Sequence, residues 1–189
     1  LSPEKDVSLA IDVASTQFFD GTNYNLAALN KKFSSGEFIT FISKLVSDHP
    51  VLSIEDPFAE DDWRSWTQFM SMAPSKLQVL GDDLFTTNLA RLQRGIDEKS
   101  ANAILIKANQ NGLVTSTQKV LNTAQANNFK TVVSARSGET EDSWLADLAT
   151  GWRASQIKVG STHGADRTAK WNRLLELEAT ENCEFAKPF

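Results

Sequence analysis

The chain has 189 residues, a hydrophobic content of 41% and a formal net charge of −5 at pH 7. It is long enough to bury one substantial core, so a single globular domain is expected. The negative charge and the lack of a Lys/Arg block give no electrostatic reason to expect nucleic acid or an anionic membrane as a partner. No segment approaches the roughly 18 apolar residues of a membrane span, and the single cysteine, Cys183, excludes an internal disulfide, so a reducing cytoplasm is the expected location.

Short apolar runs of strand length recur along the chain. They cover residues 7–12, 51–56, 77–83, 102–107, 131–135 and 155–160. Runs this short and this continuously apolar are typical of buried strands. Segments with helical spacing lie between them, such as 88–99 and 116–128. The alternation predicts a parallel α/β fold, either a (β/α) barrel or a doubly wound sheet, because right-handed crossovers return the chain to the same end of the sheet.

The segment between the first two runs is longer and carries different signals. Asp20 and Gly21 lie between aromatic residues, which predicts a hairpin turn. Ser34 or Ser35, followed by Glu37, predicts the start of a helix.

Carboxylates stand at the C-terminal ends of three successive runs: Asp12, Glu55 and Asp82. In parallel α/β folds these ends point toward one face, so the three side chains are expected to converge. Three like charges in one pocket repel one another unless a cation neutralises them, and oxygen ligands suit Mg²⁺. The sequence therefore predicts a Mg²⁺ site formed by these three residues, with Asp83 in a supporting or capping role.

Cationic side chains follow the remaining runs. Lys107 closes an apolar strand, where burial beside a cation would favour the neutral amine that a base needs. Arg136 and Ser137 begin a polar loop, and the planar fork of arginine beside a hydroxyl suits a phosphate or carboxylate. Lys158 ends the last run. These four residues predict a base and an anion clamp.

Simpler interpretations apply to several charged residues. A carboxylate at a strand end is more often a helix cap or a surface group, and Asp61 or Asp62 is expected to cap a helix. The segment GETED, residues 138–142, is expected to form a helix N-terminus whose acids complement the helix dipole. His163 is expected at the surface.

Long motifs carry a resemblance to a known family. The chain contains, in this order, SIEDPF, GDDLFTTN, ILIKANQNG, SARSGETED, ADLATG, QIKVGS and DRTAKWNRLLELE. From about Val7 to Glu178 it resembles the C-terminal portion of enolase, the phosphopyruvate hydratase of glycolysis, and most closely the bacterial form. The resemblance implies an α/β fold with a parallel (β/α) barrel of the enolase type, represented by about six of eight strands. Residues 1–189 would form this region, and the N-terminal capping domain and first barrel strands would be absent from the chain.

The resemblance also implies a reaction. The family is a Mg²⁺-dependent lyase that dehydrates 2-phosphoglycerate to phosphoenolpyruvate. Asp12, Glu55 and Asp82 match the carboxylates that hold the Mg²⁺ in contact with the substrate carboxylate, and Lys107 matches the base that removes the proton alpha to that carboxylate.

Further matches concern the phosphorylated end of the substrate and its charge. Arg136 and Ser137 match the groups that bind the substrate phosphate. Lys158 matches the lysine that helps to stabilise the enolate.

Two departures from the family pattern bear on activity. Ala135 stands where the family has a pocket histidine, and His163, Gly164 and Ala165 replace the family's residues after Lys158. Loss of the imidazole could weaken turnover if that group positions the substrate or its leaving group. The chain is therefore interpreted as an enolase-type lyase region, as a non-catalytic module that keeps the metal and anion site, or as a relative that acts on a different carboxylate.

The expected partners follow from the same reading. They are a small phosphorylated carboxylate and the missing N-terminal region, supplied in cis or in trans, and no nucleic acid or membrane. The family's general-acid glutamate and lid loops would belong to that region. A homo-oligomer is expected for the full-length protein.

Overall fold

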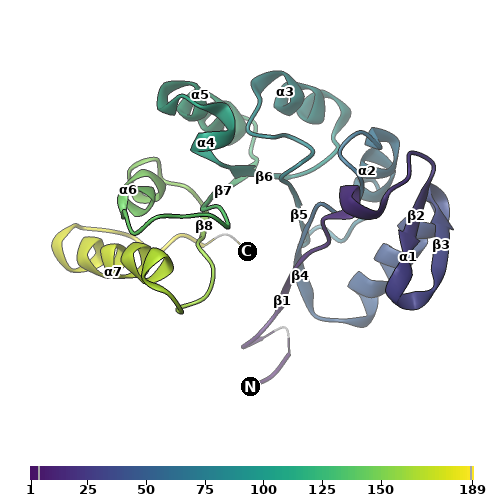
Figure 1. The fold of residues 1–189 in the computed structure, drawn as a ribbon, viewed down its shortest axis with the longest axis horizontal. Helices are drawn as coiled ribbons and strands as arrows, with labels where there is room; N and C mark the ends of the chain where they lie inside the picture. The colour runs from purple at the N-terminus through teal and green to yellow at the C-terminus, as the bar shows by residue number, and fades with distance from the viewer. Residues whose placement is uncertain (4, 188) are drawn as a thin grey trace. The chain divides into compact units, whose positions relative to one another are not determined.

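The computed structural model describes residues 1–3, 5–187 and 189. Figure 1 traces the chain and labels its elements. No described helix is long and apolar enough to cross a membrane. In chain order the elements are β1 (Leu9–Asp12), η1 (Ser15–Phe18), β2 (Asn23–Leu26), η2 (Ala27–Leu29), β3 (Lys31–Ser34), α1 (Ser35–Asp48), β4 (Val51–Glu55), α2 (Trp63–Met70), β5 (Gln78–Gly81), α3 (Leu89–Glu98), β6 (Ala103–Ile106), α4 (Ala108–Asn111), α5 (Val114–Ala126), β7 (Lys130–Ser134), α6 (Trp144–Gly151), β8 (Gln156–Lys158) and α7 (Ala165–Thr180).

The strands of the main sheet follow the order β1-β4-β5-β6-β7-β8. Strand β4 pairs in parallel with β1 and with β5, and β7 pairs in parallel with β8. Every apolar run identified in the sequence overlaps one of these strands, and helices lie between consecutive strands of the sheet. The predicted parallel α/β fold is therefore confirmed.

The chain divides into two compact units. The first unit comprises Leu1–Phe85, Ala90–Ala103 and Phe189, and the second comprises Thr86–Leu89 and Ile104–Pro188. In each unit taken by itself, the helices lie on one side of the strands (Figure 1). Within each unit, the predicted site residues lie at or shortly after the ends of the strands.

Helix α1 begins with a capping box, as the sequence predicts. The Ser34 side chain accepts a hydrogen bond from the Glu37 main-chain N–H, and Glu37 Oε2 accepts one from Ser34 N at 2.8 Å. These reciprocal bonds satisfy amides that the first helical turn leaves without partners. Ser34, rather than Ser35, is the N-cap residue.

The predicted turn at Asp20 and Gly21 is present. It precedes β2, whereas the hairpin of β2 and β3 has its turn further along the chain. Asp20 Oδ1 accepts hydrogen bonds from the main-chain N–H groups of Thr22 and Asn23, and Gly21 has φ of 93°, which suits glycine. Strands β2 and β3 are antiparallel, and the chain reverses between them at residues 27–30.

Aromatic side chains build the core of the first unit. The rings of Tyr24 and Phe38 stack with centroids 4.2 Å apart, and Phe58 packs edge-on against Trp66. The Tyr24 hydroxyl donates to Asp62 Oδ2 at 2.8 Å and accepts from Ala59 N at 3.0 Å. The hairpin therefore holds the loop that follows β4. Asp62 is the N-cap of α2, so of the two predicted caps, Asp61 and Asp62, the structure selects Asp62.

The second unit packs α5 and α6 against its strands. Val120, Leu121 and Ala124 of α5 are buried. Helix α6 begins at Trp144 with Asp147 as the acid of its first turn, so the expectation that residues 138–142 form a helix N-terminus is wrong. The physical reason is that Glu139 has other partners, the main-chain N–H of Arg136 and the ammonium group of Lys170.

The capping box gives a stability prediction. Ser34→Ala removes the side-chain oxygen that accepts from Glu37 N, and we expect the free energy of unfolding to fall by about 1 kcal/mol. Urea unfolding followed by circular dichroism measures this. Thr40→Ala is the matched control, since Thr40 is an exposed residue of the same helix and alanine has the higher helix propensity. Equal destabilisation by both substitutions would contradict the assignment of the cap.

Candidate active site

The predicted metal ligands stand at strand ends in the first unit. Asp12 is the last residue of β1, Glu55 is the last residue of β4, and Asp82 follows β5 directly. Asp12 and Glu55 are partners in the parallel register of β1 and β4. The structure thus brings these two carboxyl-bearing residues to the same level of neighbouring strands.

The register also shows which residues share a face of the sheet. Ser53 and Gln78 are register partners, and Gln78 Nε2 donates to Ser53 Oγ at 2.9 Å. Glu55 lies two residues beyond Ser53, so alternation puts it and its partner Asp12 on that face. By the same alternation Asp82, four residues beyond Gln78, belongs there too. Glu55 and Asp82 are buried, with 6% and 9% of their surfaces exposed, whereas Asp12 is exposed.

Asp56 ties the loop after β4 to the loop after β5. Its Oδ1 accepts from Asp82 N at 2.9 Å and its Oδ2 accepts from Asp83 N at 2.8 Å. Its own N–H donates to Leu80 O at 3.0 Å. The residue is 2% exposed and has φ of 41°, a strained value for a side chain with a Cβ. Asp56 therefore fixes the main chain at Asp82.

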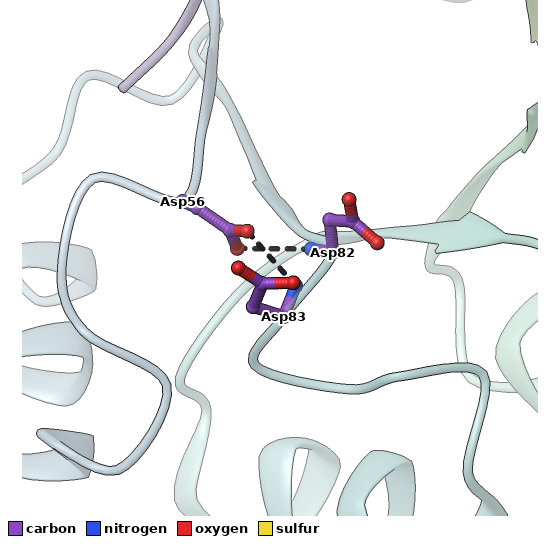
Figure 2. A group of neighbouring side chains, drawn as sticks. All are labelled: Asp56, Asp82 and Asp83. Carbon is purple, nitrogen blue, oxygen red and sulfur yellow. Dashed lines mark hydrogen bonds between the residues drawn. The ribbon is translucent and has the colours of Figure 1, made fainter. Parts of the chain in front are cut away.

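Asp56, Asp82 and Asp83 form an acidic cluster. Each offers an oxygen, and these oxygens lie within 4.8 Å of one another among the described residues. In Figure 2 the carboxylates of Asp56 and Asp83 lie together, whereas that of Asp82 points away from them. Burial raises the pKa of Asp56 to about 8, although the two backbone N–H donors favour its charged form. The cluster contains Asp82 but neither Asp12 nor Glu55.

Two sets of oxygen donors could therefore hold a cation, and both include Asp82. Carboxylate oxygens are the ligands that Mg²⁺ prefers, so the donor chemistry of either set fits this ion. Both oxygens of Asp56 already accept main-chain hydrogen bonds, which favours a structural role for that residue. The sequence does not predict the role of Asp56, because that role depends on contacts between two loops.

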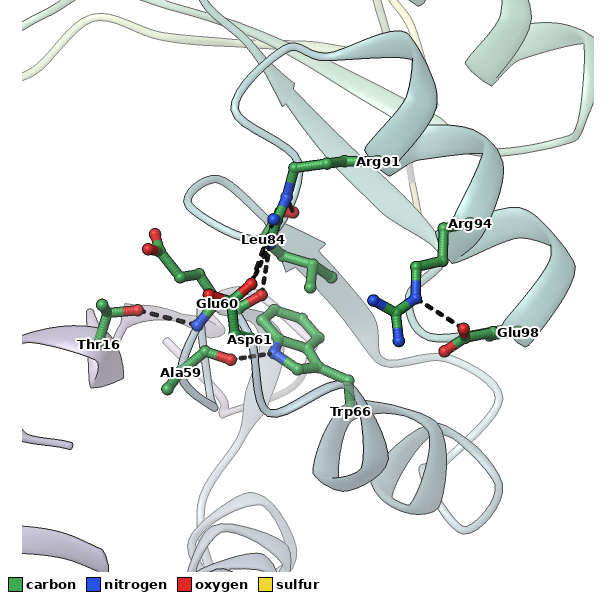
Figure 3. Close-up of polar contacts among 9 residues, drawn as sticks. All are labelled: Thr16, Ala59, Glu60, Asp61, Trp66, Leu84, Arg91, Arg94 and Glu98. Atoms are coloured by element: carbon green, nitrogen blue, oxygen red, sulfur yellow. Dashed lines mark hydrogen bonds and ion pairs between the residues drawn. The ribbon is translucent and has the colours of Figure 1, made fainter. Parts of the chain in front are cut away.

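Helix α3 also contacts the loop after β4 and the loop after β5. The Arg91 guanidinium donates to Leu84 O and to Glu60 O, both at 2.5 Å, and pairs with Asp61 at 3.2 Å. Thr16 Oγ1 accepts from Glu60 N at 3.0 Å. Figure 3 shows these contacts meeting around residues 59–61. Their partners are largely main-chain atoms, so these contacts fix the path of the chain around residues 59–61.

Lys107, the predicted base, belongs to the second unit. It directly follows β6, occupies the N-cap position of α4 and is half-buried. Its main-chain N–H donates to Thr87 Oγ1 at 2.9 Å, and Thr87 is 1% exposed. Thr87 Oγ1 in turn donates to Gln110 Oε1 at 3.0 Å. Thr87 therefore fixes the main chain of Lys107, a role that the motif GDDLFTTN does not reveal.

The predicted anion-binding residues lie in the same unit. Ser134 and Lys158 are register partners, and Ala135 N donates to Lys158 O at 2.9 Å. Arg136, which is exposed, donates from Nη1 to Asn109 Oδ1 at 3.0 Å. Asn109 lies two residues after Lys107. The second unit therefore brings the loop that begins at Arg136 close to Lys158 and to the segment after Lys107.

The two departures from the family pattern differ in their surroundings. Ala135 is buried, with 8% of its surface exposed. His163 is exposed, and its main-chain N–H donates to Ser161 Oγ at 3.3 Å. The predicted surface position of His163 is confirmed. Ser137 is exposed beside Arg136.

The bridge made by Asp56 gives a second prediction. Asp56→Asn keeps one oxygen acceptor but turns an amide toward the other main-chain N–H, which then lacks a partner. We expect the free energy of unfolding to fall by about 1–3 kcal/mol. Denaturant unfolding measures this, with Asp97→Asn on the exposed face of α3 as a control that changes stability by less than about 0.5 kcal/mol. An Asp56→Asn chain as stable as the control would show that the bridge is dispensable.

A comparison with protein families agrees with the arrangement of helices and strands. The model of the family described as "Enolase, C-terminal TIM barrel domain" matches residues 2–187. The match covers nearly the whole chain, and it agrees with the α/β order of elements. The predicted barrel of the enolase type is thereby confirmed. The chain belongs to the enolase family, through its C-terminal TIM barrel domain.

Proposed function

We propose that this chain is the barrel region of a Mg²⁺-dependent lyase that dehydrates 2-phosphoglycerate to phosphoenolpyruvate in cytoplasmic glycolysis. The observation that carries the proposal is the position of the predicted site residues at the strand ends. Each strand of the main sheet ends at, or within two residues of, one of them: Asp12, Glu55, Asp82, Lys107, Arg136 and Lys158. Such ends carry the active site in parallel barrels. The proposal extends to the bacterial form of the family, on the motifs quoted in the sequence analysis.

Asp12, Glu55 and Asp82 are the residues that would hold Mg²⁺. Glu55 and Asp82 are buried carboxyl groups, and a cation offsets the cost of burying neighbouring negative charges. When bound, Mg²⁺ would supply positive charge that makes the proton alpha to the substrate carboxylate more acidic. Asp56 supports the arrangement by fixing the main chain at Asp82.

Lys107 is the proposed base. Its Nζ would take the proton from the carbon alpha to the substrate carboxylate, and the electron pair of that C–H bond would form the new C=C bond. The C–O bond at the neighbouring carbon would break, and the departing hydroxide would take a proton from the general acid of the upstream region. Thr87 and Gln110 hold the main chain from which Lys107 projects, so the base starts from a fixed position.

The remaining predicted residues would bind the substrate. Arg136 and Ser137 would bind its phosphate, since a guanidinium fork and a hydroxyl match phosphate oxygens. Lys158 would stabilise the charge that develops on the carboxylate side. The contact of Arg136 with Asn109 supports a clamp close to the base, because Asn109 is two residues from Lys107.

Ala135 favours a second candidate function. Its buried methyl group stands where the family has a pocket imidazole. A chain that keeps the carboxylates and lysines but lacks this group could bind metal and anion without turnover, as a binding or scaffold module. A relative that acts on another carboxylate would fit the same change.

We also propose that the site is completed by an upstream region in cis or in trans, with a homo-oligomer for the full-length protein. The edge strand β1 supports this, because Leu9 is 44% exposed and Val7 just before it is 47% exposed. Apolar side chains at a sheet edge are normally covered by another strand or helix.

Magnesium titration separates the two candidate ligand sets. Glu55→Gln removes the charge but keeps the shape, and we expect it to weaken Mg²⁺ binding by about tenfold or more. Asp83→Asn should leave the affinity nearly unchanged. Isothermal titration with MgCl₂ measures both, with Glu98→Gln on the surface of α3 as a control. The opposite pattern would assign the ion to Asp56, Asp82 and Asp83.

An absorbance assay for phosphoenolpyruvate tests the reaction. The chain is assayed alone and together with its upstream region, with Mg²⁺ and 2-phosphoglycerate. Turnover is expected only with the upstream region, and Lys107→Ala is expected to lower it by about 10²–10⁴-fold because the general base is lost. A Lys107→Ala chain that still exchanges the alpha proton would contradict the assigned base.

The same assay on Ala135→His distinguishes the candidate functions. Turnover by the unchanged chain supports the lyase. Turnover only after the substitution supports the binding module. Absence of turnover in both, with Mg²⁺ binding intact, favours a different carboxylate substrate.

A further inference from the structure

Two cationic side chains of α7 reach back to the segments that carry the predicted anion-binding residues. Arg167 and Lys170 are three residues apart, so they lie on the same side of the helix. Arg167 donates from Nη1 to Val159 O at 2.7 Å and from Nη2 to Ser137 O at 3.5 Å. Lys170 donates from Nζ to Thr140 O at 2.5 Å. One helix therefore contacts both the loop after β7 and the segment after β8.

Helix α7 is itself anchored within the second unit. The Arg173 guanidinium donates from Nε and Nη2 to Asp147 Oδ1 of α6, at 3.0 Å and 2.7 Å. These bonds hold the pKa of Asp147 below its usual range. The helix that carries Lys170 is thus tied to the helix that follows the loop.

Lys170 is fully buried, with 0% of its surface exposed. Burying an ammonium group is costly unless nearby oxygens compensate for the lost water. The partners of Lys170 are both in the loop after β7: Thr140 O and, at 3.5 Å, Glu139 Oε2. Because one of these partners is a main-chain carbonyl, the lysine restrains the path of the loop itself.

Glu139 links Lys170 to the residue that is proposed to bind phosphate. Its Oε1 accepts from Arg136 N at 2.7 Å, while its Oε2 faces the ammonium group. The lysine thus holds the carboxylate, and the carboxylate holds the main chain of Arg136. The Arg136 side chain then meets Asn109. Both the main chain and the side chain of Arg136 are therefore directed by contacts within the unit.

The charge of Lys170 has a second consequence. A carboxylate so close to an anion-binding loop would repel phosphate, because like charges disfavour one another at short range. An ammonium group beside Glu139 offsets that charge. The lysine therefore fixes the shape of the loop and improves its electrostatics for an anion.

We propose that Lys170 is a positioning residue for an anion-binding loop formed by residues 135–142. It acts through Thr140 and Glu139 and does not touch the ligand. The inference rests on the proposed function, in which Arg136 and Ser137 bind the substrate phosphate. It adds that a buried lysine of α7 keeps this loop ordered.

The test compares Lys170→Met with Lys119→Met, an exposed residue of α5, in the 189-residue chain. Hydrogen exchange of the amides of 136–142 is measured by mass spectrometry, and inorganic phosphate is titrated by NMR. Lys170→Met is expected to speed exchange in this loop by about tenfold or more while α5 stays protected, and to weaken phosphate binding by about tenfold, as for other residues that orient a ligand-binding group. Lys119→Met should change neither.

Glu139→Gln separates positioning from general stability. Glutamine at position 139 keeps an oxygen that can accept from Arg136 N. It removes the negative charge of Glu139, which has lost its ammonium partner in Lys170→Met. Added to Lys170→Met, it is expected to restore part of the phosphate affinity, which a purely structural role of the lysine would not predict. Additive losses in the double variant would contradict the linkage through Glu139.

The outcomes distinguish the two proposals. Unchanged loop exchange in Lys170→Met overturns the role of Lys170, whatever the unsubstituted chain binds. Faster exchange with unchanged phosphate affinity overturns it as well. If the unsubstituted chain binds no phosphate but Lys170→Met still speeds exchange of 136–142, the proposed phosphate site fails while the ordering of the loop by Lys170 stands.

Discussion

Parallel strand pairing is the constraint on which the candidate site depends. Neighbouring strands that run the same way end at the same edge, so residues at equal register become neighbours however far apart they lie in the chain. Asp12 and Glu55 meet in this way across β1 and β4, and Ser134 meets Lys158 across β7 and β8. Main-chain hydrogen bonds between the strands set the positions of these residues, whatever side chains the residues carry.

The loops that follow the strands are positioned by side chains that bond to main-chain atoms. Asp56 accepts two amide N–H groups, Arg91 donates to two carbonyls, and Lys170 donates to one. Each is buried or half-buried: Asp56 and Arg91 contact the loops after β4 and β5, and Lys170 joins α7 to the loop after β7. A charged group that bonds to main-chain atoms fixes the path of a loop directly. These charged residues therefore hold the loops that follow the strands.

The sequence predicts the residues at strand ends well and the residues that hold the loops poorly, for a physical reason. Strand ends and the capping box of Ser34 depend on neighbours in the chain, so periodicity and spacing reveal them. Asp56 and Lys170 act through groups of other loops, and no local pattern carries that information. Residues 138–142 illustrate the difference, because their acids fit a helix start by composition, whereas Glu139 pairs with Lys170 from a distant helix. Fold class and strand-end residues could thus be predicted, but the contacts that hold them could not.

At Ala135 the main chain takes part in strand pairing independently of the side chain. The main-chain N–H of this residue donates to Lys158 O, and that bond is the same for any residue other than proline. The side chain at position 135 can therefore change without altering this main-chain bond between the ends of β7 and β8. The chemistry of the pocket and the stability of the sheet are therefore separable at this position. The strand ladder supports the side-chain groups at the strand ends but does not require them.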